Sequence, residues 1–391
     1  MIEVEAEPGT AVFDAAIVDA LGGARRELDP GRGVMVRVVW LSGVRNTGRL
    51  LLVIHHLAVD GVSWRVLVPE LASAFHRIDA GEEPEPSYSG TSVRRWSHAL
   101  RDIAPDRRVE LPRWRSILEG ADPLIGTRPL DPRLDTFDSV GRVVADVPVE
   151  LSDTVLTTLP ALFGGSVNDG LVAALALALT QWRQAQGIRT DNVLISMEGH
   201  GREAHVVPGA DVLHTVGWFT SVFPMRIDLA GIDIAEVMSS APEAAVVLKR
   251  VKEELLGVPD SGIGYGVLRY LDEVGRAELE DLRQPQISFN YLGRFSGTEA
   301  GESLGTGHWP GRRSGSGSAV RDASGFGPDV NVVTTEISGA PHIGATIAYP
   351  TGVLAERDAR AIADLWVQAL RALATYAEHS ERGDSPRPTS T

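Results

Sequence analysis

The chain has 391 residues, of which 43% are hydrophobic, so it is long enough to bury a large core as one domain or two subdomains. Its net charge of -15 argues against a nucleic-acid-binding protein, because such a protein usually needs a basic face. The chain has no cysteine, which excludes disulfides, thiolate metal sites and a cysteine nucleophile, and which fits a cytoplasmic protein.

The first half of the chain alternates predicted strands and helices. Residues rich in valine, leucine and isoleucine predict strands over 33–40 and 50–54. Apolar residues at helical spacing predict a helix over 62–78, kinked at Pro69. The remaining segments of this half are a loop over 78–90, helices over 92–103 and 111–118, and a proline-rich connector over 122–133.

The second half has the same mixed α/β character. Its longest apolar stretch, 171–179, is too short to span a membrane and lies in a predicted buried helix over 167–186. The other predicted elements are strands over 142–147, 192–197, 222–229 and 286–291, a helix over 234–256 broken at Pro242, a hairpin of 330–338 with 342–349, and a final helix over 355–377. The composition of 297–327 predicts a mobile surface loop, and that of 380–391 predicts a tail or linker.

A pair of histidines follows the predicted strand over 50–54, in the sequence His55-His56-Leu57-Ala58-Val59-Asp60-Gly61. Neighbouring side chains of a strand point to opposite faces, so one of the two histidines can face a cavity and act as a general acid or base. A lone histidine there is more often a core residue, but the following Asp-Gly pair favours a functional role. Gly61 allows close approach of a substrate, and its N–H can donate to an oxyanion. Asp60 could orient a histidine or pair with an arginine. The interpretation we favour is that it stabilises the turn.

Two further segments carry candidate chemistry. Glu198-Gly199-His200-Gly201-Arg202-Glu203 follows the predicted strand over 192–197 and places a carboxylate at the edge of a sheet, where alone it would be a solvated turn residue. Three glycines at alternate positions in 260–266 lack the pattern of a nucleotide site and are read as a flexible packing loop. His200 and His205 have the wrong spacing for two ligands on one helical turn, and we expect no metal site.

Taken together, these segments resemble the epimerization domain of nonribosomal peptide synthetases, a branch of the condensation-domain superfamily. The segment from His55 to Gly61 matches the superfamily signature HHxxxDG, and residues 62–65 extend it in the manner of the epimerization branch. The segment from Glu198 to Arg202 resembles the EGHGR motif of that branch. Three more segments match its motifs in order: residues 216–224, 262–266 and 289–293.

The resemblance implies a fold of two chloramphenicol acetyltransferase-like subdomains, residues 1–135 and 136–379, arranged as a V with a tunnel between them. The implied substrate is an aminoacyl or peptidyl thioester on the phosphopantetheine arm of a peptidyl carrier protein, so the chain itself binds no cofactor. Neighbouring synthetase domains are further implied partners, and no nucleic acid or membrane is.

The resemblance also implies the site residues. His56 and Glu198 are the implied catalytic pair, one group for each face of the α-carbon that is inverted. The residues implied to contact substrate or line the tunnel are Gly61, Ser63, Asn290 and Tyr291. Structural support is implied for His55, Asp60 and Trp218.

Members of that family have the histidine pair much deeper in the chain, so the resemblance implies an incomplete first subdomain here. The nearest alternative is a condensation domain, which forms peptide bonds and has no need of Glu198 as a second proton carrier. Two others are a non-catalytic remnant that docks a carrier protein and an acyltransferase that uses coenzyme A. The substrate amino acid and the division of acid and base roles between His56 and Glu198 stay open at this point.

Overall fold

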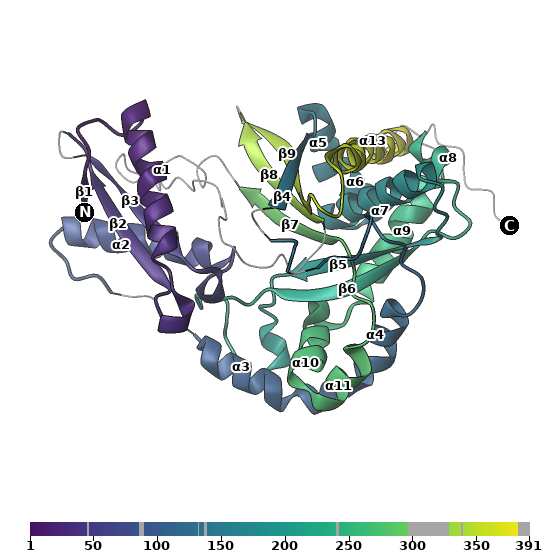
Figure 1. Ribbon diagram of the computed structural model, residues 1–391, viewed down its shortest axis with the longest axis horizontal. Coiled ribbons are helices and arrows are strands. Elements are labelled where there is room, and N and C mark those ends of the chain that lie inside the picture. Colours follow the sequence, from purple (N-terminus) through teal and green to yellow (C-terminus); the bar gives the residue numbers. More distant parts are fainter. Residues whose placement is uncertain are drawn as a thin grey trace. The chain divides into compact units, whose positions relative to one another are not determined.

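The computed structural model describes residues 1–44, 47–85, 90–131, 133–136, 139–239, 242–295, 328–337 and 339–381 (Figure 1). The chain divides by contacts into two units, Met1–Ser97 with Pro208–Thr220, and His98–Val207 with Ser221–Thr391. This division differs from the boundary predicted at residue 135, because residues 98–135 group with the second unit and residues 208–220 with the first. The predicted loop over 297–327 lies outside the described residues.

The first unit contains a three-stranded sheet in the order β1 (Ile2–Glu3), β2 (Val36–Ser42) and β3 (Gly48–Ile54). β1 is parallel to β2, and β2 pairs with β3 in an antiparallel register that places Val36 opposite Ile54. The helix α1 (Ala11–Arg26) packs on one face, where Phe13 and Leu41 are fully buried. The helix α2 (Ser63–Asp79) follows and continues as one helix through Pro69, and α3 (Val93–Asp102) begins in the first unit and ends in the second.

The second unit contains a six-stranded sheet in the order β4-β9-β8-β7-β5-β6 (Figure 1). Its strands are β4 (Val140–Asp146), β5 (Asn192–Gly199), β6 (Ser221–Asp228), β7 (Ser288–Phe295), β8 (Asp329–Ile337) and β9 (Ala340–Pro350). β7 is parallel to both β5 and β8, and the other pairs are antiparallel. The hairpin predicted near the C-terminus is therefore confirmed as β8 and β9.

Helices make up the rest of the second unit. They are α4 (Leu111–Leu118), α5 (Val149–Leu156), α6 (Thr158–Phe163), α7 (Val167–Ala185), α8 (Ile234–Met238), α9 (Ala244–Leu256), α10 (Ile263–Leu271), α11 (Glu273–Leu279) and α13 (Glu356–Glu381). The predicted break near Pro242 is confirmed, because α8 ends at Met238 and α9 begins at Ala244. One prediction was wrong: residues 263–266 belong to α10 rather than to a loop. The predicted tail over 380–391 lies outside the described residues except for 380–381, which end α13.

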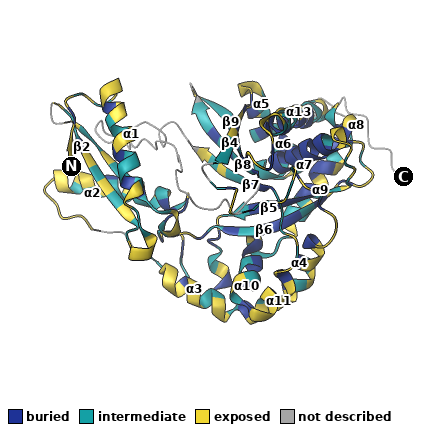
Figure 2. Cartoon of the chain, viewed as in Figure 1, coloured by how far each residue is buried: buried dark blue, intermediate teal, exposed yellow. Residues whose placement is uncertain are grey.

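The predicted buried helix is confirmed as α7, which is buried on nearly all sides (Figure 2). It begins with a capping box in which the Ser166 hydroxyl and the Asp169 carboxylate each accept a backbone N–H. α13 packs along it, and the indole N–H of Trp366 donates to the carbonyl of Leu171 at 3.2 Å. Among the described residues, no single helix has the length and hydropathy of a membrane span; Val149–Phe163 and Val167–Ala185 reach it only as a pair bent by 102°.

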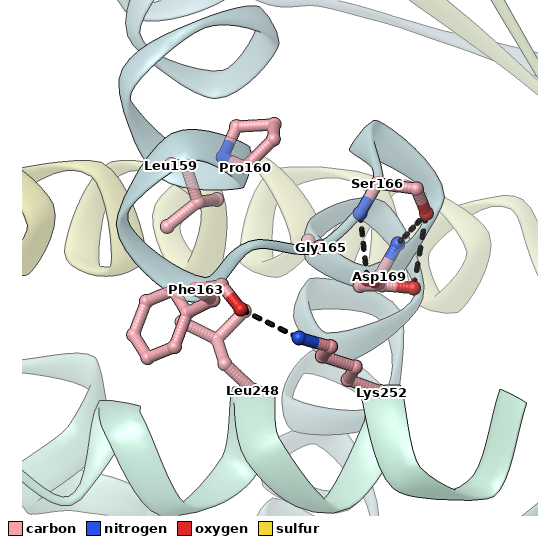
Figure 3. A pocket seen from close by; sticks show the side chains of 9 residues that line it. Leu159, Pro160, Phe163, Gly165, Ser166, Asp169, Leu248 and Lys252 are labelled. Atoms are coloured by element: carbon pink, nitrogen blue, oxygen red, sulfur yellow. Dashed lines mark hydrogen bonds between the residues drawn. The ribbon is translucent and has the colours of Figure 1, made fainter. Parts of the chain in front are cut away.

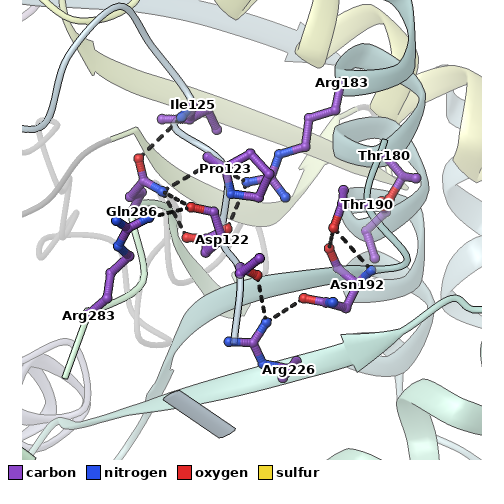
Figure 4. Close-up of polar contacts among 12 residues, drawn as sticks. Asp122, Pro123, Ile125, Thr180, Arg183, Thr190, Asn192, Arg226, Arg283 and Gln286 are labelled. Atoms are coloured by element: carbon purple, nitrogen blue, oxygen red, sulfur yellow. Dashed lines mark hydrogen bonds and ion pairs between the residues drawn. The ribbon is translucent and has the colours of Figure 1, made fainter. Parts of the chain in front are cut away.

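A buried ion pair ties the connector after α4 to the rest of the second unit (Figure 4). The Asp122 carboxylate accepts from Arg183 of α7 at 2.9 Å and from the amide of Gln286 at 2.8 Å. Both charged side chains are only 2% exposed. Arg226 of β6 donates to the carbonyls of Ile117 and of residue 121, at 2.7 and 3.1 Å. The predicted connector is thus irregular in backbone but fixed in position.

The two faces of the six-stranded sheet differ in chemistry, and this difference positions the site. Side chains alternate along each strand, so the register assigns each residue to one face. The face against the helices is apolar: Ile195, Met197, Phe289, Val330, Val332, Ala345 and Ile347. The opposite face is polar over the three neighbouring strands β5, β7 and β8, where it carries Ser196, Glu198, Ser288, Asn290, Asp329 and Asn331. The predicted carboxylate therefore lies on the polar face of a central strand.

Candidate functional site

The histidine pair of the first unit follows the strand rather than lying in it. β3 ends at Ile54, and a single helical turn, His56–Ala58, begins directly after His55. The ring Nδ1 of His55 accepts from the backbone N–H of Leu57 at 3.1 Å, so His55 caps this turn. His56 is exposed. The prediction that strand alternation separates the two side chains was wrong: the helical turn does so, because it uses His55 as its cap and leaves His56 accessible.

Asp60 and Ser63 form a buried polar pair below the turn. The Asp60 carboxylate is 4% exposed and accepts from the N–H of Ser63 at 2.8 Å and of Phe219 at 3.1 Å. The Ser63 hydroxyl is fully buried, within hydrogen-bond distance of both the carbonyl and the N–H of Gly217, at 3.0 and 3.1 Å. Ser63, predicted to contact substrate or line the tunnel, thus uses its hydroxyl inside the unit, and a role toward substrate stays a prediction. Gly61, in contrast, is exposed, with open space where a Cβ would be.

These contacts place Trp218 against His56. The backbone on either side of Trp218 is held, at Gly217 by Ser63 and at Phe219 by Asp60. The indole lies with its centroid 4.9 Å from that of the His56 ring, at an interplanar angle of 49°. Trp218 is still 47% exposed. The predicted supporting residues thus converge on the one histidine of the pair that is free of the local cap.

Glu198 is the penultimate residue of β5 in the second unit, inside the strand rather than after it. The side-chain amide of Asn290 on β7 donates to its Oε2 at 2.6 Å. Asp329 on β8 shares this face and accepts from Ser288 and Asn331. Burial, with a smaller contribution from the charge of Asp329, raises the pKa of Glu198 to about 7, although the hydrogen bond from Asn290 acts in the opposite direction.

Tyr291 does not share this site. It is adjacent to Asn290 in β7, so its side chain points to the other face, where it packs against the apolar core. Its hydroxyl lies 3.0 Å from that of Thr334, which is fully buried. Of the two residues predicted to line the tunnel, only Asn290 contacts Glu198, and the lining role of both stays a prediction.

The glycines of residues 260–266 have packing roles. Gly262 has a φ of 78°, and a Cβ there would lie 2.1 Å from the Phe223 ring. A Cβ on Gly264 would lie 2.1 Å from the carboxylate of Glu110, whereas Gly266 has open space. Two of the three glycines thus allow close contact between α10 and its neighbours, a requirement that sequence spacing alone does not separate from a flexible loop.

A small pocket lies among helices, away from the polar face of the sheet (Figure 3). It is a shallow hollow, partly open to solvent, and is lined by residues of α6, α7 and α9, including Leu159, Phe163 and Leu248. The Lys252 ammonium at its edge donates to the carbonyl of Phe163 at 2.7 Å. Because this ammonium is used within the fold, we assign no chemistry to the pocket.

Comparison with known proteins gives the family. Residues 15–383 match the family described as "Condensation domain". The chain is 34% identical over 307 residues to one of the linear gramicidin synthase proteins of Brevibacillus parabrevis, and 33% over 249 residues to surfactin synthase subunit 2 of Bacillus subtilis. These matches cover 77% and 63% of this chain, but only 4% and 6% of those far longer proteins.

Two solved structures share the fold. The epimerization domain from the third module of tyrocidine synthetase B matches with a TM-score of 0.78 and 23% identity, over 96% of this chain and 80% of that one. The X-domain from teicoplanin biosynthesis matches with a TM-score of 0.65 and 18% identity, over 96% and 78%. Both likenesses bear on the fold.

Proposed function

This chain belongs to the condensation-domain family, and we propose that within the family it is an epimerase of carrier-bound thioesters. Its substrate would be an aminoacyl or peptidyl group on the phosphopantetheine arm of a peptidyl carrier protein. It would convert the L residue at the thioester into a mixture of L and D. Two findings support this function: the fold that the chain shares with the epimerization domain of tyrocidine synthetase B, and the motif around Glu198.

The chemistry needs two proton carriers. A thioester acidifies the adjacent α-C–H bond, which breaks when a general base takes the proton, and the electron pair moves into an enolate. The enolate then takes a proton on its opposite face from a general acid, which forms the inverted C–H bond. In this proposal His56 and Glu198 are the two carriers, and the exposed N–H of Gly61 is a donor to the enolate oxygen.

The setting of Glu198, a carboxylate on the polar face of the sheet that accepts from the amide of Asn290, is the observation that carries the proposal. A general acid–base group works best when its pKa is near the working pH, because both of its protonation states are then populated. Glu198 meets this condition with a pKa of about 7, on a polar sheet face and held by Asn290. Peptide-bond formation makes no such demand on a second residue.

A condensation activity is the rival, favoured by the family description and by the synthase names of the sequence relatives. One experiment separates the two. A carrier protein loaded with an L-aminoacyl thioester is incubated with the chain in deuterated water, with and without a second carrier that bears an acceptor amine. An epimerase puts deuterium on the α-carbon and produces the D form; a condensation domain forms an amide only when the acceptor is present.

Variants test the residue assignment. Glu198→Gln and His56→Ala should each lower α-proton exchange by ~10²-fold or more, the usual contribution of a general acid or base. Glu150→Gln, which neutralises an exposed carboxylate on α5, is the matched control and should exchange like the wild type. Full exchange in either test variant would overturn the two-carrier assignment. A folded wild type that neither exchanges nor condenses would leave only carrier docking.

A further inference from the structure

The turn before α10 has an unusual backbone. Asp260 and Ser261 have φ values of 42° and 51°, and they are the only non-glycine residues with positive φ in the described part of the chain. Gly262 continues the left-handed run at 78°. A side chain disfavours this conformation, so two such residues in succession persist only where surrounding contacts hold them. Strain of this kind gathers at sites where a chain must be placed accurately.

Two side chains, those of His205 and Arg107, hold the turn through the Asp260 carboxylate. His205, just after the Glu198 motif, approaches it with Nε2 2.8 Å from Oδ1, and Arg107 donates to Oδ2. Arg107 also donates to Glu110 at 3.0 Å, and the other oxygen of Glu110 accepts the indole N–H of Trp114 at 3.0 Å. Asp260 therefore joins three separate segments of the second unit, and it is 28% exposed, less than the 61% of His205.

The turn of residues 260–262 contacts the end of β5 and its strand partner on β6. The carbonyl of Ser261 accepts from the Ser221 hydroxyl at 3.2 Å, and Ser221 is the strand partner of Gly199. A Cβ at Gly199 would lie 3.1 Å from that same carbonyl and 2.7 Å from the Ser221 hydroxyl. The turn therefore holds the last residue pair of the β5–β6 ladder, Gly199 and Ser221. Gly199 follows Glu198 directly, so this fixed pair lies next to the residue that carries the carboxylate.

We propose that Asp260 is a positioning residue for Glu198: it holds the left-handed turn whose carbonyl fixes the end of β5. The proposal rests on the proposed function only for what Glu198 does, since the clamp on β5 is a property of the second unit alone. It also explains the glycine after Glu198, which allows the turn to approach the strand.

The test uses Asp260→Asn. Asparagine tolerates a left-handed backbone, so the variant removes the charge and keeps the turn accessible. Asp272→Asn is the matched control, because Asp272 likewise pairs with an arginine, Arg108 at 2.7 Å, whereas its other contacts cap α11 and do not involve β5. Two quantities are measured: backbone amide exchange of residues 196–201 and 220–223, and α-proton exchange on the carrier-bound thioester.

In Asp260→Asn we expect amide exchange at the end of β5 to rise by about tenfold, the size of one lost charge-assisted hydrogen bond. The turnover number should fall by ~10²-fold with KM unchanged, because a small displacement of a reacting group has that effect. Asp272→Asn should change neither quantity beyond its effect on overall stability. Wild-type protection of β5 in Asp260→Asn overturns the clamp.

The two proposals fail in distinguishable ways. If the wild type does not exchange the α-proton while Asp260→Asn loosens β5, the clamp stands and the proposed function falls. If the wild type exchanges and Asp260→Asn matches it in both measurements, the clamp falls alone. Should Asp260→Asn not fold, Ser221→Ala removes only the hydroxyl that binds the turn and must loosen the end of β5 in the same direction; unchanged protection there overturns the proposal.

Discussion

Glu198 stabilises the folded chain less as the pH rises, and Glu198→Gln measures by how much. The pKa of Glu198 is about 7 in the fold against an ordinary value of 4.5, chiefly because of burial. The folded state therefore binds this proton more tightly than the unfolded state, and the free energy of unfolding falls as the pH rises from about 4.5 to about 7. The loss amounts to about 3 kcal/mol in total, of which about 2.5 kcal/mol falls between roughly pH 5 and pH 8.

Glutamine has the shape of glutamate and an oxygen that can still accept from Asn290, but it has no proton to lose. We expect Glu198→Gln to be more stable than the wild type by about 2–3 kcal/mol near pH 8, with a smaller difference near pH 5. Urea unfolding at both pH values gives the four free energies, and Glu150→Gln serves as the control. Equal pH dependence in the wild type and Glu198→Gln would refute the raised pKa, and with it one support for the proposed function.

Four other substitutions test the packing around the site. Asp122→Ala leaves Arg183 buried without its carboxylate and should lower the free energy of unfolding by about 3–5 kcal/mol, which urea unfolding would detect; a loss below about 1 kcal/mol would contradict this account. Gly262→Ala should destabilise the chain, because its Cβ would clash with the Phe223 ring. Gly266→Ala lies within α10 with open space around it and should stabilise the chain by about 0.5–1 kcal/mol. Melting temperatures of the two variants that move in the same direction would count against the packing argument. Trp218→Ala should lower α-proton exchange by about tenfold or more, because it removes the ring that contacts His56. Far-UV circular dichroism should stay unchanged, because the indole is only half-buried. Full exchange in this variant would show that the indole has no role there.

Local patterns in the sequence predicted most strands and the long helices. The strand predicted over 286–291 overlaps β7, and the alternation of side chains along a strand places Asn290 and Tyr291 on opposite faces from the sequence alone. Helices α5 and α6 were not predicted, because they have only 8 and 6 residues and little periodicity to detect. The start of α10 was predicted as a loop because glycine is a poor helix former, and only the contact between Gly264 and Glu110 explains why glycine is needed there.

The parts of the site that could not be predicted depend on contacts between distant residues. Asp60 was placed in its turn by local reasoning, but its bond to the N–H of Phe219 joins positions 159 residues apart. The raised pKa of Glu198 depends on burial and on Asp329, which follows a long segment of low complexity. No spacing rule in one sequence links such residues, because the register of the strands brings them together.

The segment Pro208–Thr220 has a consequence for how this protein can be recombined. It belongs by contacts to the first unit, although the chain before and after it belongs to the second, so the chain crosses between the units after residues 97, 207 and 220. A chimaera that exchanges only the N-terminal portion, cut anywhere between residues 63 and 208, would pair a foreign Asp60–Ser63 turn with the resident Gly217 and Phe219. The unit that can be inherited or transplanted intact is therefore discontinuous: it consists of residues 1–97 together with the thirteen-residue segment 208–220.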